Sequence, residues 1–71
     1  GVIDNVAVQY FSLQIYSKWG ELIFNSNDIT QKWDGTFKGK KMPNGAYLWM
    51  LNYVNRRGRK MYEQGTVLLI R

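Results

Sequence analysis

The sequence predicts a small all-β domain, an antiparallel β-sandwich of about six to seven short strands. Three observations carry this prediction. Apolar and polar residues alternate in steps of two, no segment keeps the period of about 3.6 residues typical of a helix, and turn signals recur every ~8–12 residues. With 71 residues, three Trp, five Tyr and three Phe, residues 1–71 are expected to form a single domain with an aromatic core.

The first half of the chain predicts a hairpin. In FSLQIYS (11–17), Phe11, Leu13 and Ile15 share one face, which is the pattern of a half-buried strand. The preceding VAVQY alternates in the opposite phase, so we expect a bulge or a break where the two segments meet. Trp19-Gly20 is expected to form the turn, and ELIFN then returns as the second strand.

The second half predicts a central strand followed by a final strand. AYLWMLNYVN is apolar on both faces, which favours a strand covered on both sides. RRGR is expected to form a tight turn, and KMYEQGTVLLIR to return as the last strand, with an irregularity at Gly65. Strands of this number and length are typical of an Ig-like sandwich.

Between the two halves lies KWDGTFKGKKMPNGAYLW, which we interpret as a structural corner. Pro43 presets φ for a turn, and Gly45 can take the positive φ required before the central strand. Asp34 is expected to accept hydrogen bonds from backbone N–H groups just downstream, and Trp33 to close one end of the sandwich. The residues assigned to this structural motif are Trp33, Asp34, Gly35, Pro43, Gly45 and Tyr47.

The composition argues against catalysis. Cysteine is absent, which excludes disulfides and thiolate metal sites, and histidine is absent, which removes the usual general base and the commonest metal ligand. We therefore expect no enzyme activity, no cofactor and no catalytic or metal-binding residues. No run of about 18 apolar residues predicts a membrane span, and the first ten residues do not have the pattern of a signal peptide.

Three ligand classes compete with a purely structural interpretation. A phosphate-binding loop is disfavoured because Gly35 and Gly39 are too close and no helix follows them. A calcium loop drawn from Asn25, Asn27, Asp28 and Asp34 has too few carboxylates, and their spacing matches no EF-hand pattern. The net charge of +5 and the aromatic content resemble those of a single-strand nucleic-acid binder, but the basic residues fall in turns and the aromatics in strands, which favours solvation and core packing.

Four motifs in order resemble the gliding-motility-associated C-terminal domain, also called the type B C-terminal domain, of type IX secretion substrates in Bacteroidota. They are Ser17-Lys18-Trp19-Gly20, Trp33-Asp34-Gly35, Pro43-Asn44-Gly45-Ala46-Tyr47 and Ile70-Arg71. The resemblance runs from about Leu13 to Arg71. Ser17-Lys18 replaces the more usual Asn-Arg, which keeps one positive charge but loses a bidentate fork.

The resemblance implies that this domain is a secretion address. Such domains direct a protein from the periplasm through the type IX translocon to the cell surface or the medium. The expected partners are that translocon and an outer-membrane protein of the PorP/SprF family, and the expected cargo is a gliding adhesin-like surface protein. The family usually begins with a further segment, so we expect the chain to be the C-terminal part of a much larger secreted protein. An alternative resemblance, to the Ig-like domain of flagellar hook-capping proteins, implies an appended structural or carbohydrate-facing module.

A secretion signal that another protein recognises needs exposed contact residues, and aromatic and arginine side chains are the usual ones. The candidate partner-binding residues are Lys18, Trp19, Glu21, Arg56, Arg57, Arg59 and Arg71. The edge of the last strand could in addition extend a partner's sheet. The competing interpretation is that Trp19 caps the core and the arginines only keep the domain soluble.

Overall fold

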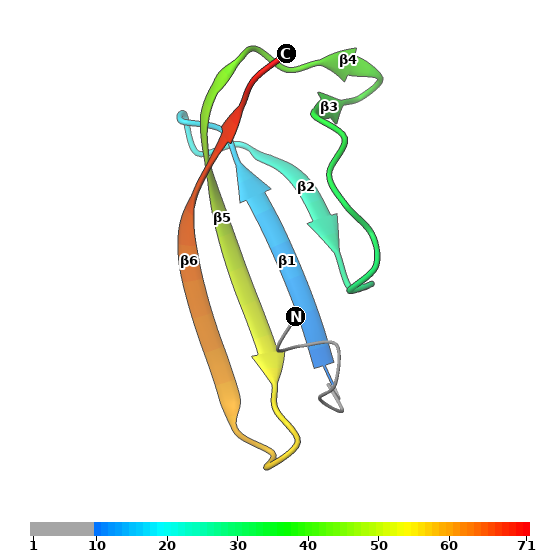
Figure 1. Cartoon of the computed structure of the whole chain (residues 1–71), viewed down its shortest axis with the longest axis vertical. Helices are drawn as coiled ribbons and strands as arrows, with labels where there is room; N and C mark the ends of the chain where they lie inside the picture. Colours follow the sequence, from blue (N-terminus) through cyan, green and yellow to red (C-terminus); the bar gives the residue numbers. More distant parts are fainter. Residues whose placement is uncertain (1–9) are drawn as a thin grey trace.

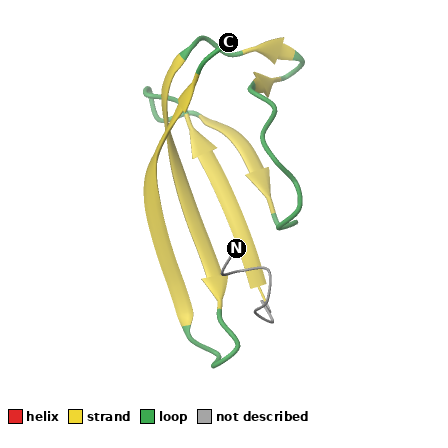
Figure 2. Ribbon diagram, viewed as in Figure 1, coloured by secondary structure: helices red, strands yellow, loops and turns green. Residues whose placement is uncertain are grey.

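The structure is a computed structural model, and it describes residues 10–71. Within this range all the regular elements are strands, as Figure 2 shows. They are β1 (Tyr10–Tyr16), β2 (Leu22–Ser26), β3 (Thr36–Phe37), β4 (Lys40–Lys41), β5 (Gly45–Val54) and β6 (Lys60–Leu69). The predicted all-β class is therefore confirmed.

The main sheet has the strand order β2-β1-β5-β6, and all its neighbouring strands are antiparallel. β5 lies in the interior of the sheet, as its apolar sequence predicts, between β1 and β6 (Figure 1). The long hairpin β5–β6 keeps an uninterrupted register from Gly45↔Leu69 to Val54↔Lys60. β1 and β2 form the predicted first hairpin, with a register shift between Ile15 and Tyr16.

The core lies at one end of one face of this sheet. Its buried apolar residues are Ile15, Ile23 and Tyr47. The short hairpin β3–β4 lies beside β2 at this end of the molecule (Figure 1), and Phe37 of β3 packs against the cluster together with the flanking residues Trp33 and Met42. The partly buried residues packed there are Phe24, Trp33, Phe37, Met42, Trp49 and Leu69.

Two faces of the main sheet can thus be distinguished. The covered face carries Ile15, Tyr47 and Trp49, because Ile15 and Trp49 are register partners and Tyr47 lies two residues before Trp49. The open face carries Leu48, Thr66 and Leu68, and none of the described elements packs over it. The prediction that the central strand is covered on both sides is therefore wrong for the described residues. Apart from Tyr47 and exposed Ala46, the β5 side chains are only half-buried.

The sequence predicts an irregularity at Gly65, but the last strand is regular there. Gly65 pairs regularly with Trp49, and the indole ring of Trp49 lies over it. A Cβ atom at position 65 would come within 2.7 Å of the Trp49 ring. The glycine therefore serves close side-chain packing rather than a bulge. The expected bulge or break at Tyr10-Phe11 is not found, because both residues belong to β1 and pair in unbroken register with Val54 and Tyr53 of β5. The rest of VAVQY lies outside the described residues.

Candidate functional site: the Trp19 turn and its surroundings

The turn between β1 and β2, residues 17–21, is held rigidly from inside by Ser17, and we call it the Trp19 turn. The buried Ser17 hydroxyl accepts hydrogen bonds from the backbone N–H groups of Trp19 (3.3 Å) and Glu21 (3.2 Å). Two backbone hydrogen bonds, Ser17 N to Glu21 O and Gly20 N to Ser17 O, both 2.9 Å, close the loop. Gly20 has a φ of 84°, which other residues rarely adopt. The turn is therefore fixed independently of its outer side chains.

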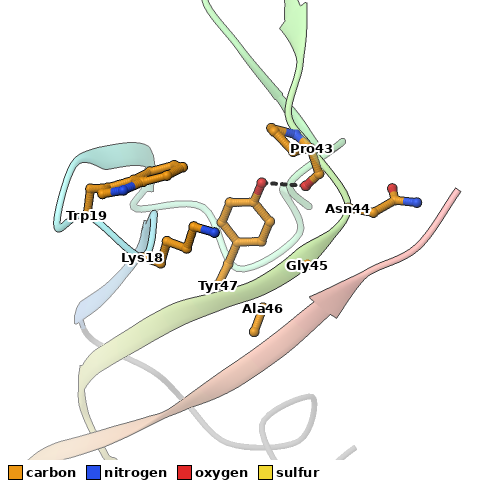
Figure 3. A pocket seen from close by; sticks show the side chains of 7 residues that line it. All are labelled: Lys18, Trp19, Pro43, Asn44, Gly45, Ala46 and Tyr47. Carbon is orange, nitrogen blue, oxygen red and sulfur yellow. Dashed lines mark hydrogen bonds between the residues drawn. The ribbon is translucent and has the colours of Figure 1, made fainter.

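This rigid turn presents Trp19 to solvent. The side chain is 75% exposed, so Trp19 does not cap the core. The Lys18 ammonium lies 4.8 Å from the centre of the indole ring, a cation–π contact, and Glu21 is also exposed. Figure 3 shows Lys18 and Trp19 on one side of a small pocket, with Tyr47 and residues 43–46 on the other.

The opposite wall of the pocket is fixed by Tyr47. Its hydroxyl donates a 2.6 Å hydrogen bond to the carbonyl oxygen of Pro43 (Figure 3). Gly45 between them has a φ of 147°, a positive value as the sequence predicts. On the covered face, the Tyr47 ring packs edge to face against the Trp33 ring, and the two ring centres are 5.0 Å apart. The pocket wall is thus directly continuous with the core.

The Trp33-Asp34-Gly35 segment is a compact turn. The Trp33 indole N–H donates to the carbonyl oxygen of Thr36 at 2.9 Å. One Asp34 carboxylate oxygen accepts from the Thr36 hydroxyl at 2.6 Å and from the Thr36 backbone N–H at 3.0 Å. Two hydrogen bonds from Thr36 lower the pKa of Asp34 below its ordinary value of 3.8. The bond from the Thr36 hydroxyl has the larger effect, and the bond from its backbone N–H has the smaller one. The carboxylate acts here as a turn anchor.

The lowered pKa of Asp34 predicts a contribution to acid stability. Its stabilising effect is complete above the unfolded pKa of 3.8 and is lost as the pH falls through the lower folded pKa. The wild-type chain should therefore lose thermal stability below about pH 4, and Asp34→Asn should lose less over the same window because asparagine does not titrate. Thermal melts followed by circular dichroism at successive pH values measure this. Parallel curves for the two proteins would contradict it.

Arg71 ties the last strand to the two turns that flank the β3–β4 hairpin. Its guanidinium donates to the carbonyl oxygens of Gly35, at 2.6 Å, and Met42. Its backbone N–H donates to the Asn44 side-chain oxygen at 3.2 Å. Of the candidate partner-binding residues, Arg71 is thus engaged within the domain, and the groups it holds belong to the turns before and after the hairpin.

The basic turn, residues 55–59, lies at the other end of the main sheet (Figure 1). The Asn55 side-chain oxygen accepts from the backbone N–H groups of Arg57 and Arg59, both at 3.0 Å, and fixes the turn. Arg56, Arg57 and Arg59 are exposed. The candidate partner-binding residues therefore fall in separate places: the Trp19 turn, the basic turn and the Arg71 contact.

Sequence reasoning missed the side-chain hydrogen bonds of Ser17, Asn44 and Asn55. Ser and Asn commonly form such local hydrogen bonds, so their positions beside Gly-containing turns were a usable signal for Ser17 and Asn55. Asn44 differs because it bonds to Arg71, a residue far away in the sequence. No local pattern could have indicated that contact.

Two further findings limit the chemistry of the part of the chain that the structure describes. Residues 10–71 bring together no group of three side chains of the types that hold metal ions. The same residues form no helix that is long and apolar enough to cross a membrane. What they present outward is a rigid turn with an exposed aromatic anchor, a cationic turn and a strand edge.

The fold defines the class: a small antiparallel β-domain with an exposed aromatic turn and an exposed basic turn. Comparison with known families goes further, because the model of the CHU_C type IX secretion signal domain matches residues 2–69. The chain belongs to this family, which confirms the resemblance drawn from its four motifs, and the hook-capping alternative is not favoured. Searches of curated proteins and of solved structures found no match. The domain is a targeting signal for the type IX secretion system and directs export to the cell surface or beyond the outer membrane.

Proposed function

We propose that the folded domain is read by a PorP/SprF-family outer-membrane protein that docks on the Trp19 turn. The observation that carries the proposal is the 75% exposure of Trp19 on a turn whose backbone is fixed by the Ser17 hydroxyl. Binding energy in protein interfaces concentrates in a few aromatic and arginine residues, and a rigid anchor loses little entropy on binding. Lys18 and Glu21, which flank Trp19, are placed to select the partner by charge.

The other exposed residues have supporting roles in this proposal. Arg56, Arg57 and Arg59 give one end of the domain a positive field that would steer it toward an acidic partner surface. Arg71 has an indirect role: its guanidinium donates hydrogen bonds to the carbonyl oxygens of Gly35 and Met42 and so stabilises the turns on either side of the β3–β4 hairpin. The proposed role is docking and not catalysis.

We further propose that residues 1–71 form one domain at the C-terminal side of a larger secreted protein, with a gliding adhesin-like cargo before it and an Ig-like arrangement of its strands. The match of the family model to residues 2–69 supports a single domain over this range. The antiparallel main sheet with a small second sheet on one face supports the Ig-like arrangement.

The proposed docking is tested by fusing residues 1–71 behind a signal peptide and a fluorescent protein in a bacterium with a type IX system. Fluorescence should reach the cell surface or the medium, and should stay in the periplasm when the PorP/SprF-family partner is deleted. Trp19→Ala should lower export about tenfold, which corresponds to the loss of ~1.4 kcal/mol of binding.

Tyr10→Ala is the matched control, because Tyr10 is also an exposed aromatic residue, at the far end of β1 from the Trp19 turn. It should export normally. Normal export of Trp19→Ala would contradict the role of the turn, and a folded wild-type fusion held in the periplasm would contradict the proposal as a whole.

A further inference from the structure

β6 forms one edge of the main sheet over its full length. The strand order places β5 on one side of it, and no described strand lies on the other. At ten residues it is twice as long as β2, the opposite edge, which has five residues and an irregular register with β1. β2 also lies beside β3, whereas the outer side of β6 has no such neighbour among the described elements. The two edges are thus protected very unequally.

The free hydrogen-bonding groups of β6 can be assigned by parity. The Asn55 N–H donates to the Arg59 carbonyl oxygen at 3.0 Å, and the Arg71 N–H points inward to the Asn44 side chain. Arg59 and Arg71 thus direct backbone groups inward, and both have odd numbers. Because inward and outward backbone groups alternate along an antiparallel strand, the N–H and C=O groups of the odd-numbered residues of β6 point toward β5. The even-numbered residues therefore turn their N–H and C=O groups outward; they are Lys60, Tyr62, Gln64, Thr66 and Leu68.

From Gln64 onward, this edge lacks the usual devices that prevent strand pairing. Exposed edge strands normally carry a proline, a bulge or closely spaced charges. β6 has no proline, its register with β5 is unbroken, and the run from Gln64 to Ile70 contains no charged residue. Apolar side chains on β6 and just after it are open to solvent: Tyr62 is 55% exposed, Leu68 is 63% exposed, and Ile70, which follows the strand, is 72% exposed. Such an edge is a template for another strand.

We propose that the outer edge of β6 takes up a β-strand of the partner protein, and that this strand carries acidic side chains beside the basic turn. The acidic chemistry follows from charge, because Arg56, Arg57 and Arg59 are exposed at the end of the hairpin where β6 begins. A second copy of the chain is a poorer occupant, since each copy carries a formal net charge of +5 and the two would repel each other. The inference rests on the proposed function, in which a partner reads the folded domain.

Thr66→Pro tests the edge through its backbone. The Thr66 N–H points outward, so proline removes no β5–β6 hydrogen bond but removes a donor and adds bulk where the partner strand would pair. In the export assay, Thr66→Pro is expected to lower export about tenfold. Thr66→Ala, which keeps the N–H, should export within about twofold of the wild type. A thermal melt first establishes that each variant is folded.

The outcomes separate the two proposals. Export of folded Thr66→Pro at the wild-type level would overturn the edge proposal and leave docking at the Trp19 turn intact. Failure of the wild-type fusion to be exported would overturn both. If Thr66→Pro does not fold, a double variant that combines Thr66→Lys with Leu68→Lys tests the edge proposal instead. Both side chains are exposed, and charges at these positions oppose strand pairing. Unchanged export of this folded double variant would overturn the edge proposal.

Two further measurements test the identity of the occupant. Arg56→Glu combined with Arg57→Glu should lower export, since acidic partner residues would then be repelled. Unchanged export would overturn the acidic chemistry. Sedimentation of the purified wild-type chain should show a monomer. A dimer that Thr66→Pro dissociates would overturn the proposed partner and assign the edge to a second copy of the chain.

Discussion

Replacement of Tyr47 by alanine is expected to lower the free energy of unfolding by about 3–5 kcal/mol, the usual effect of removing a large buried aromatic side chain. Tyr47 is 6% exposed, and it joins the small buried cluster to the partly buried shell through its edge-to-face contact with Trp33. Its loss also removes the hydrogen bond to Pro43 that fixes the start of β5. Urea denaturation followed by tryptophan fluorescence measures the change.

Tyr47→Phe separates the ring from the hydroxyl. It keeps the packing against Trp33 and removes only the hydrogen bond to Pro43, so it should lower the free energy of unfolding by about 1 kcal/mol. A domain of this size has little stability to lose, and Tyr47→Ala should therefore leave much of the protein unfolded at 37 °C. A loss of less than about 1 kcal/mol for Tyr47→Ala would show that the core does not depend on this residue.

Gly35→Ala is expected to lower the free energy of unfolding by about 2–4 kcal/mol, for two reasons that add. The residue has a φ of 82°, a conformation that strains any side chain with a Cβ atom. A Cβ atom there would also come within 2.7 Å of the Arg71 guanidinium and 3.1 Å of the Leu69 side chain. The guanidinium would have to move from the carbonyl oxygen of Gly35.

Gly39→Ala provides the matched control for this effect. Gly39 has nearly the same φ, 79°, but no atom lies within 4 Å of the position its Cβ would take. It should therefore show the backbone strain alone, about 1–2 kcal/mol. The difference between the two variants measures the close approach of Arg71 and Leu69, and equal losses would contradict that packing.

Much of the fold follows from local patterns in the sequence. Period-2 alternation locates β1 and β2, and the continuous apolar run identifies β5 as the interior strand. Turn chemistry predicts the positive φ of Gly45 and the backbone hydrogen bond accepted by Asp34. These features depend on residues only a few positions apart, which is why they can be read without the structure.

The surfaces could be predicted less completely because they depend on distant contacts. Local sequence leaves open whether Trp19 caps the core or faces solvent, since that depends on what else fills the end of the sheet. The apolar pattern of β5 suggested cover on both faces, yet the second sheet in the described range is only the short β3–β4 hairpin. The role of Gly65 depends on its register with Trp49, which the long β5–β6 hairpin sets.

The contacts of Arg71 also govern the order in which the domain can fold. Arg71 bonds to Met42 and Gly35, which lie 29 and 36 positions earlier in the chain. Because contacts between distant residues require a large loop to close, they form late and slowly. A nascent chain that ends before Arg71 cannot make these bonds, whatever its other strands have formed. The β3–β4 corner therefore gains its contacts with Arg71 only after the whole of β6 has been synthesised.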